Sequence, residues 1–491
     1  MISDKDRHEA FVSGHVGSNE WHIQLTVLAA QLGPILFSCA RATFAASRAL
    51  ATPSRRKRES GNGTKPEECA ATFPADFACV VLPMLLAFTL PDQVPALVFA
   101  EVCALAILVA IGSFRPYSPQ PLRQRATPKS APTVPAPETT ATRKPQSSVI
   151  AAYRAMAMVS IVFVILAVDF RVFPRHHAKT ETFGTSMMDA GVGSLAFSAG
   201  LASKPPNSLA AVVPRTIPLL ILGALRTLAV KATDYHEHVS EYGVHWNFFL
   251  TLAGILLLDG LFTRLLARTP SLFKDNARPW MGWWLAGVFL AFAHEVLLKG
   301  FGLLDFVLHA DRSSSWIAAN KEGVISLMGY LGLFFLGRAH GAGIHLREAS
   351  RGLALFRAAG CIALLATIYA ILPGVCGLDP PSRRVVNASY ICWVVLYNEV
   401  VIFIFAVGDL IHSFLAPATS SEYTTPLERA VNRNQLFVFL LGNLLTGLTN
   451  KLIITVDVPD HIANVVLLFY MLCVLGLASW LDSRKVTLKA W

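Results

Sequence analysis

Asp169 and Lys179 are the two residues of this sequence whose types and spacing could support proton transfer. Asp169 ends the apolar run IVFVILAV, and Lys179 follows beyond Pro174, which interrupts any continuous helix. A carboxylate at a low-dielectric edge near an ammonium could remove the proton of a hydroxyl. The lysine could then offset negative charge that develops on an acyl oxygen. The alternative is that Asp169 anchors a helix end by pairing with Arg171 or Arg175.

Histidines lie close to this pair in the sequence and raise the question of a metal site. His176 and His177 precede Lys179, and a second polar segment at 231–247 adds further potential ligands. These ligands are Asp234, His236, Glu237, His238 and His245. A zinc site drawn from both segments is conceivable, but the chain contains neither an HExxH nor a CxxC motif. Hydrogen-bonded histidines at a membrane interface are the ordinary explanation, so we expect no metal.

A third feature is a polar stripe within the apolar segment 432–455. Asn443, Thr446, Gly447 and Asn450 recur at spacings of three to four residues, which places them on one face of a helix. Small and polar residues of this kind often mediate packing between membrane helices. The alternative is that the stripe lines a cavity for a lipid or an acyl chain.

The elements that must position these residues follow from the composition. The chain has 491 residues, of which 54% are hydrophobic and 15% are charged, and its mean hydropathy is +0.50. Soluble domains carry about 25% charged residues, so we predict an all-α, polytopic transmembrane helix bundle with about thirteen helices. The apolar runs able to cross about 30 Å of hydrocarbon are 22–47, 76–91, 93–112, 149–168, 186–203, 214–230, 247–267, 281–298, 323–338, 352–372, 388–413, 435–454 and 462–481.

The charges predict the orientation of this bundle. The formal net charge is +10, and an odd number of helices with a luminal N-terminus places nearly every basic cluster on the cytosolic side, together with the C-terminus. The excess of Lys and Arg therefore sets topology, and nucleic-acid binding is disfavoured. The segment 113–148 is basic and rich in Pro, which predicts a disordered cytosolic loop. A glycosylation sequon at Asn387 would face the lumen.

Three segments of the chain together resemble one known family. They are DFRVFPRHHAKTETFGTSMMDAGVG (169–193), TDYHEHVSEYGVHWNFFLT (233–251) and NRNQLFVFLLGNLLTGLTN (432–450). They are similar to the inositol acyltransferases of glycosylphosphatidylinositol (GPI) anchor biosynthesis, a family that includes the fungal GPI-anchored wall transfer proteins and their animal counterpart, PIG-W. Neither composition nor helical periodicity would produce the runs TETFGTS and EHVSEYGVHWNFF.

The resemblance implies a specific reaction. Members of the family are multi-pass enzymes of the endoplasmic-reticulum membrane. They transfer a fatty acyl group, usually palmitoyl, from acyl-CoA to the inositol 2-hydroxyl of glucosaminyl-phosphatidylinositol. The resemblance maps the family's acidic and basic residues onto Asp169 and Lys179, which we therefore predict to be catalytic. The whole chain, 1–491, would form one membrane-embedded O-acyltransferase domain that uses acyl-CoA as a co-substrate and needs no cofactor.

Further residues are predicted to contact the substrates. Arg175, His176 and His236 could contact the lipid phosphate or the acyl-CoA, because guanidinium and imidazolium groups suit phosphate recognition. The other predicted substrate-binding residues lie in the three matching runs: Thr182, His245, Asn247, Asn443 and Asn450. The rival hypothesis is a multi-pass lipid transporter or scramblase, whose polar residues would form a translocation path without acyl transfer.

Overall fold

A computed structural model of the chain describes residues 10–51, 66–113, 145–233, 239–266, 279–343, 351–415 and 422–488, together with Arg7. These residues form helices and no β-strand, apart from one isolated bridge between His15 and Thr180. The predictions for His236 and for residues 114–144 of the Pro-rich loop lie outside the described residues. Within the described ranges, the all-α prediction is confirmed.

Each predicted apolar run coincides with a helix in the described parts of the chain. These helices are α2 (Glu20–Ala51), α3 (Pro66–Thr89), α4 (Val94–Ser113), α5 (Pro145–Ala167), α6 (Met187–Ala202), α7 (Val213–Thr233), α9 (Phe248–Leu266), α11 (Pro279–Gly300), α14 (Lys321–Gly341), α15 (Arg351–Cys376), α16 (Ala388–Leu415), α18 (Gln435–Leu452) and α19 (Asp460–Ser483). Among the described residues, ten helices are long and apolar enough to cross a membrane, and α6 is a shorter apolar helix. The fold is therefore a polytopic membrane bundle, while the number of spans stays a prediction.

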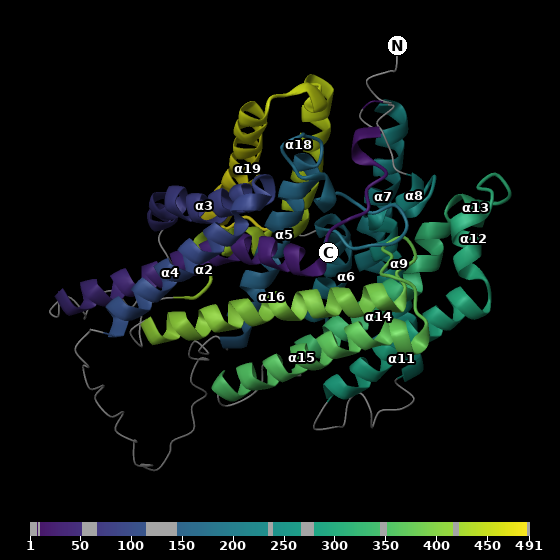
Figure 1. Cartoon of the computed structure of the whole chain (residues 1–491), viewed down its shortest axis with the longest axis horizontal. Coiled ribbons are helices and arrows are strands. Elements are labelled where there is room, and N and C mark those ends of the chain that lie inside the picture. The colour runs from purple at the N-terminus through teal and green to yellow at the C-terminus, as the bar shows by residue number, and fades with distance from the viewer. Residues whose placement is uncertain are drawn as a thin grey trace.

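Shorter elements connect the long helices. They are η2 (Pro91–Gln93), η3 (Arg175–His177), η4 (Leu209–Ala211), α8 (Val239–Tyr242), α12 (Leu303–His309), α13 (Trp316–Ala319), α17 (Pro426–Arg433) and η5 (Thr455–Asp457). In Figure 1, α15 and α16 run side by side, and α18 and α19 form a hairpin at the top of the view. The long helix α16 packs against α2, α5 and α6, which come from the N-terminal part of the chain, and also against α15. It therefore connects N-terminal helices of the bundle with a later one.

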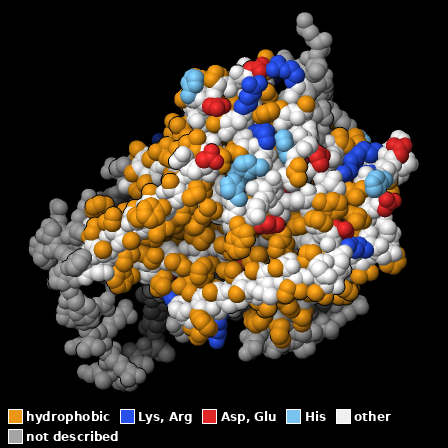
Figure 2. Space-filling model, viewed as in Figure 1, with side chains coloured by type: hydrophobic (Ala, Val, Ile, Leu, Met, Phe, Trp, Pro, Cys, Tyr) orange, Lys and Arg blue, Asp and Glu red, His pale blue; other side chains and the backbone are white. Residues whose placement is uncertain are grey.

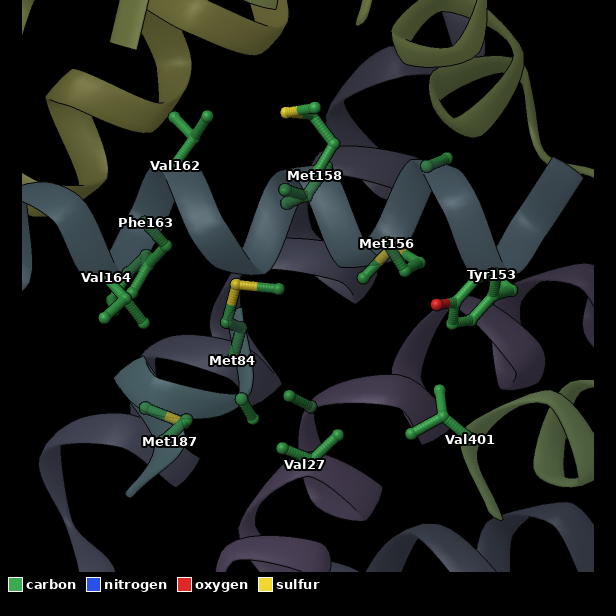
Figure 3. Packing of buried hydrophobic residues seen from close by; sticks show 14 of the residues in the cluster. Val27, Met84, Tyr153, Met156, Met158, Val162, Phe163, Val164, Met187 and Val401 are labelled. Atoms are coloured by element: carbon green, nitrogen blue, oxygen red, sulfur yellow. The ribbon is translucent and has the colours of Figure 1, made fainter. Parts of the chain in front are cut away.

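Close helix packing depends on small residues where helices cross. A Cβ atom added to Gly200 of α6 would collide with the backbone of Phe334 in α14, and one added to Gly337 of α14 would collide with the backbone of Phe197. Glycine therefore lets the two backbones touch, as is common in membrane bundles. Figure 3 shows α5 at the centre of the core, where Met156 and neighbouring side chains meet residues of α2, α3, α6 and α16.

The outer surface separates into apolar and charged regions. Figure 2 shows a broad apolar surface across one face, while most charged side chains lie along the upper edge and toward α12 and α13. Exposed large apolar side chains include Phe289 and Phe292 of α11 and Phe356 of α15. Apolar surface of this extent suits lipid contact rather than water.

Loops predicted to share the luminal side lie together at one end of the bundle. The N-terminal segment meets the 168–186 loop through the bridge from His15 to Thr180. The amide of Gly184 donates to the carbonyl of Pro381 in the 377–387 loop at 2.8 Å. Arg7 pairs with Asp457 near the start of α19 at 2.8 Å. These contacts agree with the predicted alternation of the helices; which compartment each end faces stays a prediction.

The sequon residue Asn387 is built into the start of α16. Its Oδ1 atom accepts from the amide of Tyr390 at 3.1 Å and from the amide of Ser382 at 2.9 Å. Its Nδ2 atom donates to the carbonyl of Pro380 at 2.9 Å, and the residue is only 3% exposed. Because the side chain caps the helix, it is not presented to a glycosylating enzyme in the folded chain.

Candidate active site

A large cavity lies inside the bundle and contains both residues predicted to be catalytic. Its volume is about 1070 Å³, and its wall is mostly apolar. Part of this wall is visible in Figure 3, where Val27, Tyr153, Val164, Met187 and Val401 come from four helices. The polar and charged residues of the lining are Arg7, Gln31, Tyr153, Ser160, Asp169, Lys179, Ser194, Arg226, Glu241, Tyr242, Trp246, Asn247, Tyr397, Asn398, Asn443, Thr446, Asn450, Lys451 and Thr455.

Asp169 lies just beyond the end of α5, where the chain turns away from the helix. It is 5% exposed. Its Oδ2 atom accepts a hydrogen bond of 2.7 Å from Nδ2 of Asn450, near the end of α18. The polar stripe on α18 therefore faces the cavity, and its last member orients the carboxylate. This supports the cavity alternative for the stripe over a role in packing alone.

Arg175 orders the turn that carries Asp169. Its guanidinium donates to the carbonyls of Val168, Phe170 and Phe173 at distances between 2.6 and 2.9 Å. Burial lowers the pKa of Arg175 to about 10, and the nearby charge of Asp169 opposes that shift. The guanidinium of Arg175 therefore keeps its positive charge at neutral pH. Because it donates its hydrogen bonds to backbone carbonyls, Arg175 is a residue that positions the turn bearing Asp169.

Lys179 reaches the cavity from the same loop but has a different partner. Its ammonium forms an ion pair with Glu241 of α8, which also lines the cavity. The side chain of Lys179 is 33% exposed and that of Glu241 is 14% exposed. The second polar segment of the sequence thus contributes to the site through Glu241, a residue that we did not single out from the sequence.

A buried network around Asp189, near the start of α6, fixes the segment that follows Lys179 and joins it to the 377–387 loop. The carboxylate of Asp189 accepts from the amide of Thr180 at 3.1 Å, from its hydroxyl at 2.8 Å and from the hydroxyl of Ser186 at 2.8 Å. Nε of Arg383 donates to the other carboxylate oxygen at 2.8 Å. Asp189 is fully buried and Arg383 is 5% exposed. One carboxylate therefore satisfies donors from two parts of the chain that are distant in sequence, the 180–186 loop and Arg383.

The cavity includes two of the other predicted asparagines, each with a structural hydrogen bond. Nδ2 of Asn247 donates to the carbonyl of Gly223 at 2.8 Å, and its Oδ1 accepts from the amide of Phe249 at 3.1 Å. Nδ2 of Asn443 donates to the carbonyl of Phe439 at 2.8 Å. Both side chains line the cavity. The hydrogen bonds of Asn247 stabilise the start of α9, and that of Asn443 lies within α18.

The structure does not bring every predicted substrate-binding residue to the cavity. Among the described residues, the lining does not include Arg175, His176, Thr182 or His245. His245 lines a separate, smaller hollow beside α7 and α9. Burial lowers the pKa of His176, and the nearby His22 adds to the shift. This shift favours the neutral imidazole of His176 over the imidazolium on which the prediction of phosphate recognition depends.

Arg226 of α7 lines the cavity and was missed in the sequence. It lies in the apolar run 214–230, where an isolated basic residue is costly unless it faces a polar interior or a cavity. That signal could have identified it. Arg7 and Lys451 also line the cavity. Arg7 lies outside the apolar runs and carries no such signal, whereas Lys451 lies within the run 435–454 and carries the same signal as Arg226.

The fold and the cavity define a class of protein. It is a polytopic helical membrane protein with a lipid-sized apolar cavity, at one end of which lie a carboxylate, an ammonium and amide side chains. The family model for GWT1 matches residues 4–481 of the chain. This chain therefore belongs to the GWT1 family.

Named relatives share most or nearly all of its length. GPI-anchored wall transfer protein 1 of Aspergillus fumigatus is 33% identical over 526 aligned positions, which cover 98% of each chain. The protein of the same name from Candida albicans is 33% identical over 389 positions, which cover 70% of this chain and 76% of the relative. Phosphatidylinositol-glycan biosynthesis class W protein of Dictyostelium discoideum is 28% identical over 540 positions, with 99% of each chain covered.

Proposed function

We propose that this chain acts in GPI-anchor biosynthesis, in the endoplasmic-reticulum membrane, as an acyl-CoA-dependent O-acyltransferase. The names of its relatives, which refer to GPI-anchored wall proteins and to phosphatidylinositol-glycan biosynthesis, support the pathway. The observation that supports the reaction is the position of Asp169, held by Asn450 at one end of an apolar cavity that Lys179 also lines. The acceptor is the inositol 2-hydroxyl of glucosaminyl-phosphatidylinositol, and the donor is a fatty acyl-CoA, most simply palmitoyl-CoA.

The proposed chemistry assigns one role to each residue. Asp169 accepts the proton of the inositol hydroxyl as its oxygen attacks the thioester carbonyl carbon. The ammonium of Lys179 stabilises the negative charge that develops on the carbonyl oxygen. The new ester C–O bond forms, the C–S bond breaks, and CoA leaves as a thiolate that takes up the proton held by Asp169, which restores the carboxylate. Asn450 acts as a positioning residue because its amide fixes the orientation of the Asp169 carboxylate.

The apolar wall of the cavity would contact the hydrocarbon chains of both substrates, the acyl chain of the acyl-CoA and the lipid chains of glucosaminyl-phosphatidylinositol. A cavity of about 1070 Å³ exceeds the usual range of small-molecule sites, roughly 300–1,000 Å³. It is lined by Leu222, Leu225, Phe439 and Leu444, among others, and these side chains suit methylene chains. Arg226 and Lys451 lie on the same lining and suit the phosphates of a lipid or of CoA.

Acyl transfer is tested directly in microsomes from a strain that lacks its own inositol acyltransferase and expresses this chain. Supplied with palmitoyl-CoA and glucosaminyl-phosphatidylinositol, these microsomes should form an inositol-acylated product that resists phosphatidylinositol-specific phospholipase C. A chain that is expressed and correctly located but yields no such product would refute the enzyme hypothesis. A lipid transporter or scramblase would instead redistribute the glycolipid between leaflets without esterifying it.

Replacing Lys179 by Met should lower the turnover number by roughly 100- to 1,000-fold, as loss of a single oxyanion-stabilising group does elsewhere. The measurement is the rate of CoA release at saturating substrates. Lys299→Met is the matched control, because its side chain is equally exposed, 33%, and pairs with Asp379 away from the cavity. Equal rates in the two variants would remove Lys179 from the mechanism.

Replacing Gly447 by Leu should narrow the cavity and change acyl-chain preference. A Cβ at Gly447 meets no atom within 4 Å, and the residue lines the cavity, so the larger side chain enters open space. We expect the rate with palmitoyl-CoA to fall at least about tenfold relative to decanoyl-CoA. Gly360→Leu on α15 is the control, since its Cβ also meets open space, outside the lining. An unchanged ratio in Gly447→Leu would place the acyl chain elsewhere.

A further inference from the structure

Three histidines from distant parts of the chain meet at the end of the bundle that holds the catalytic loop. His22 lies in the first turn of α2, and His176 and His177 form η3, within the loop between Asp169 and Lys179. The ring centroids of His176 and His177 are 4.3 Å apart, and that of His22 lies 5.1 Å and 5.3 Å from them. One ring nitrogen of each residue lies within 4.8 Å of those of the other two.

The nitrogens of this cluster are available to a ligand. His177 is completely buried, and neither of its ring nitrogens hydrogen-bonds to any residue that the structure describes. The same holds for Nε2 of His176 within the described ranges. The hydroxyl of Ser18 lies 3.2 Å from Nδ1 of His22, which leaves Nε2 of His22 to face its neighbours. Buried polar atoms normally have a hydrogen-bond partner. The ring nitrogens of this cluster therefore suit a ligand that can accept a lone pair from each of the three imidazoles.

We propose that His22, His176 and His177 together bind one divalent transition-metal ion of the zinc class. Three neutral imidazoles are a common ligand set for zinc, with a fourth position open to solvent. Ligands at about 2.1 Å in a tetrahedron lie about 3.4 Å apart, so nitrogens now within 4.8 Å need only small ring rotations. His22 and His176 are partly exposed, which gives an ion a path of entry.

The ion has a structural role that is independent of the proposed acyl transfer. It joins the start of α2 to the turn after Pro174, and so fixes the loop between Asp169 and Lys179, whereas the Asp189 network holds the segment that follows Lys179. With the ion bound through Nε2, Nδ1–H of His22 donates to the hydroxyl of Ser18, 3.2 Å away, and this bond holds the ring in one orientation, as outer partners of metal ligands do. The sequence could not reveal this site, because His22 is far from the histidine pair along the chain.

Metal binding by the purified full-length chain tests the proposal without any assay of activity. The protein is prepared without a polyhistidine tag, stripped with a chelator and titrated with Co²⁺. We expect one ion per chain, a visible absorption band typical of tetrahedral Co²⁺ with nitrogen ligands, and loss of that band when Zn²⁺ is added. A wild-type chain that takes up no Co²⁺ or Zn²⁺ at all would overturn the proposal.

Two substitutions assign the ion to this cluster. His22→Ala changes a partly exposed ring and should weaken Co²⁺ binding by at least about 100-fold, more than loss of an outer partner costs. His461→Ala, at an exposed histidine of α19, is the matched control and should bind as the wild type does. Size-exclusion chromatography establishes that both variants are folded. Undiminished binding in a folded His22→Ala variant would place any bound ion elsewhere and refute the site.

Discussion

Asp169→Asn should lower the rate of inositol acylation by about 100- to 10,000-fold, the usual contribution of a general base. Asparagine keeps the shape of the side chain, and its Oδ1 can still accept the hydrogen bond from Asn450, so the fold should be unchanged. What is lost is the ability to accept the hydroxyl proton. The measurement is acylated glucosaminyl-phosphatidylinositol formed per minute in microsomes, normalised to the amount of protein.

The control for this substitution is Asp460→Asn. Asp460 begins α19 at the same end of the bundle, is exposed, and lies outside the described cavity lining. The same chemical change there should leave the rate close to that of the wild type. Full activity in Asp169→Asn would rule out Asp169 as the base, and an equal loss in both variants would point to the fold rather than to the chemistry.

Of the substitutions proposed for this protein, Asp189→Ala should lower the free energy of unfolding the most. The substitution leaves the guanidinium of Arg383 buried without its carboxylate, and it also removes the acceptor of two hydrogen bonds from Thr180 and one from Ser186. Removing one partner of a buried ion pair costs about 3–5 kcal/mol. The expected result is a clear fall in the thermal unfolding temperature of the detergent-solubilised protein, measured by intrinsic fluorescence.

A double variant distinguishes loss of the ion pair from loss of packing. If the cost of Asp189→Ala comes from a stranded charge, Asp189→Ala combined with Arg383→Met should be more stable than the single Asp189 variant. Asp305→Ala is the control, because Asp305 pairs with His309 on the surface, where ion pairs contribute little. An Asp189→Ala protein that unfolds at the wild-type temperature would contradict this account of the network.

The helices could be predicted from the sequence because each one must be apolar over its own length. Every run found by hydropathy coincides with a helix within the described ranges. The position of Asp169 just beyond the end of α5, and of Lys179 in the loop that follows, was also predicted from local sequence and from the family resemblance. Both residues line the same cavity. These features are encoded by neighbours along the chain, and so a single sequence suffices to find them.

Partners across the bundle could not be predicted in this way. Periodicity places Asn450 on a stripe but says nothing about which loop that stripe meets, and the partner proves to be Asp169. The same holds for the pairing of Lys179 with Glu241. His245 was expected at the substrate because of its matching motif, yet it lines a different hollow. The local sequence pattern determines which residues share one face of a helix. The arrangement of the helices in the bundle determines which residues that face contacts.

The hydrogen bond between Asn450 and Asp169 has a consequence for how the chain is made. The two residues are 281 positions apart. At about 5–20 residues per second, a ribosome needs roughly 14 seconds to a minute to cover that separation. During this interval α5 has been synthesised and the Asp169 carboxylate that follows it lacks the amide of Asn450, while eight of the long helices described above, from α6 to α18, still have to be made. The contact that orients the Asp169 carboxylate therefore forms only after α18 has been made, and a chain truncated before α18 would carry Asp169 without Asn450.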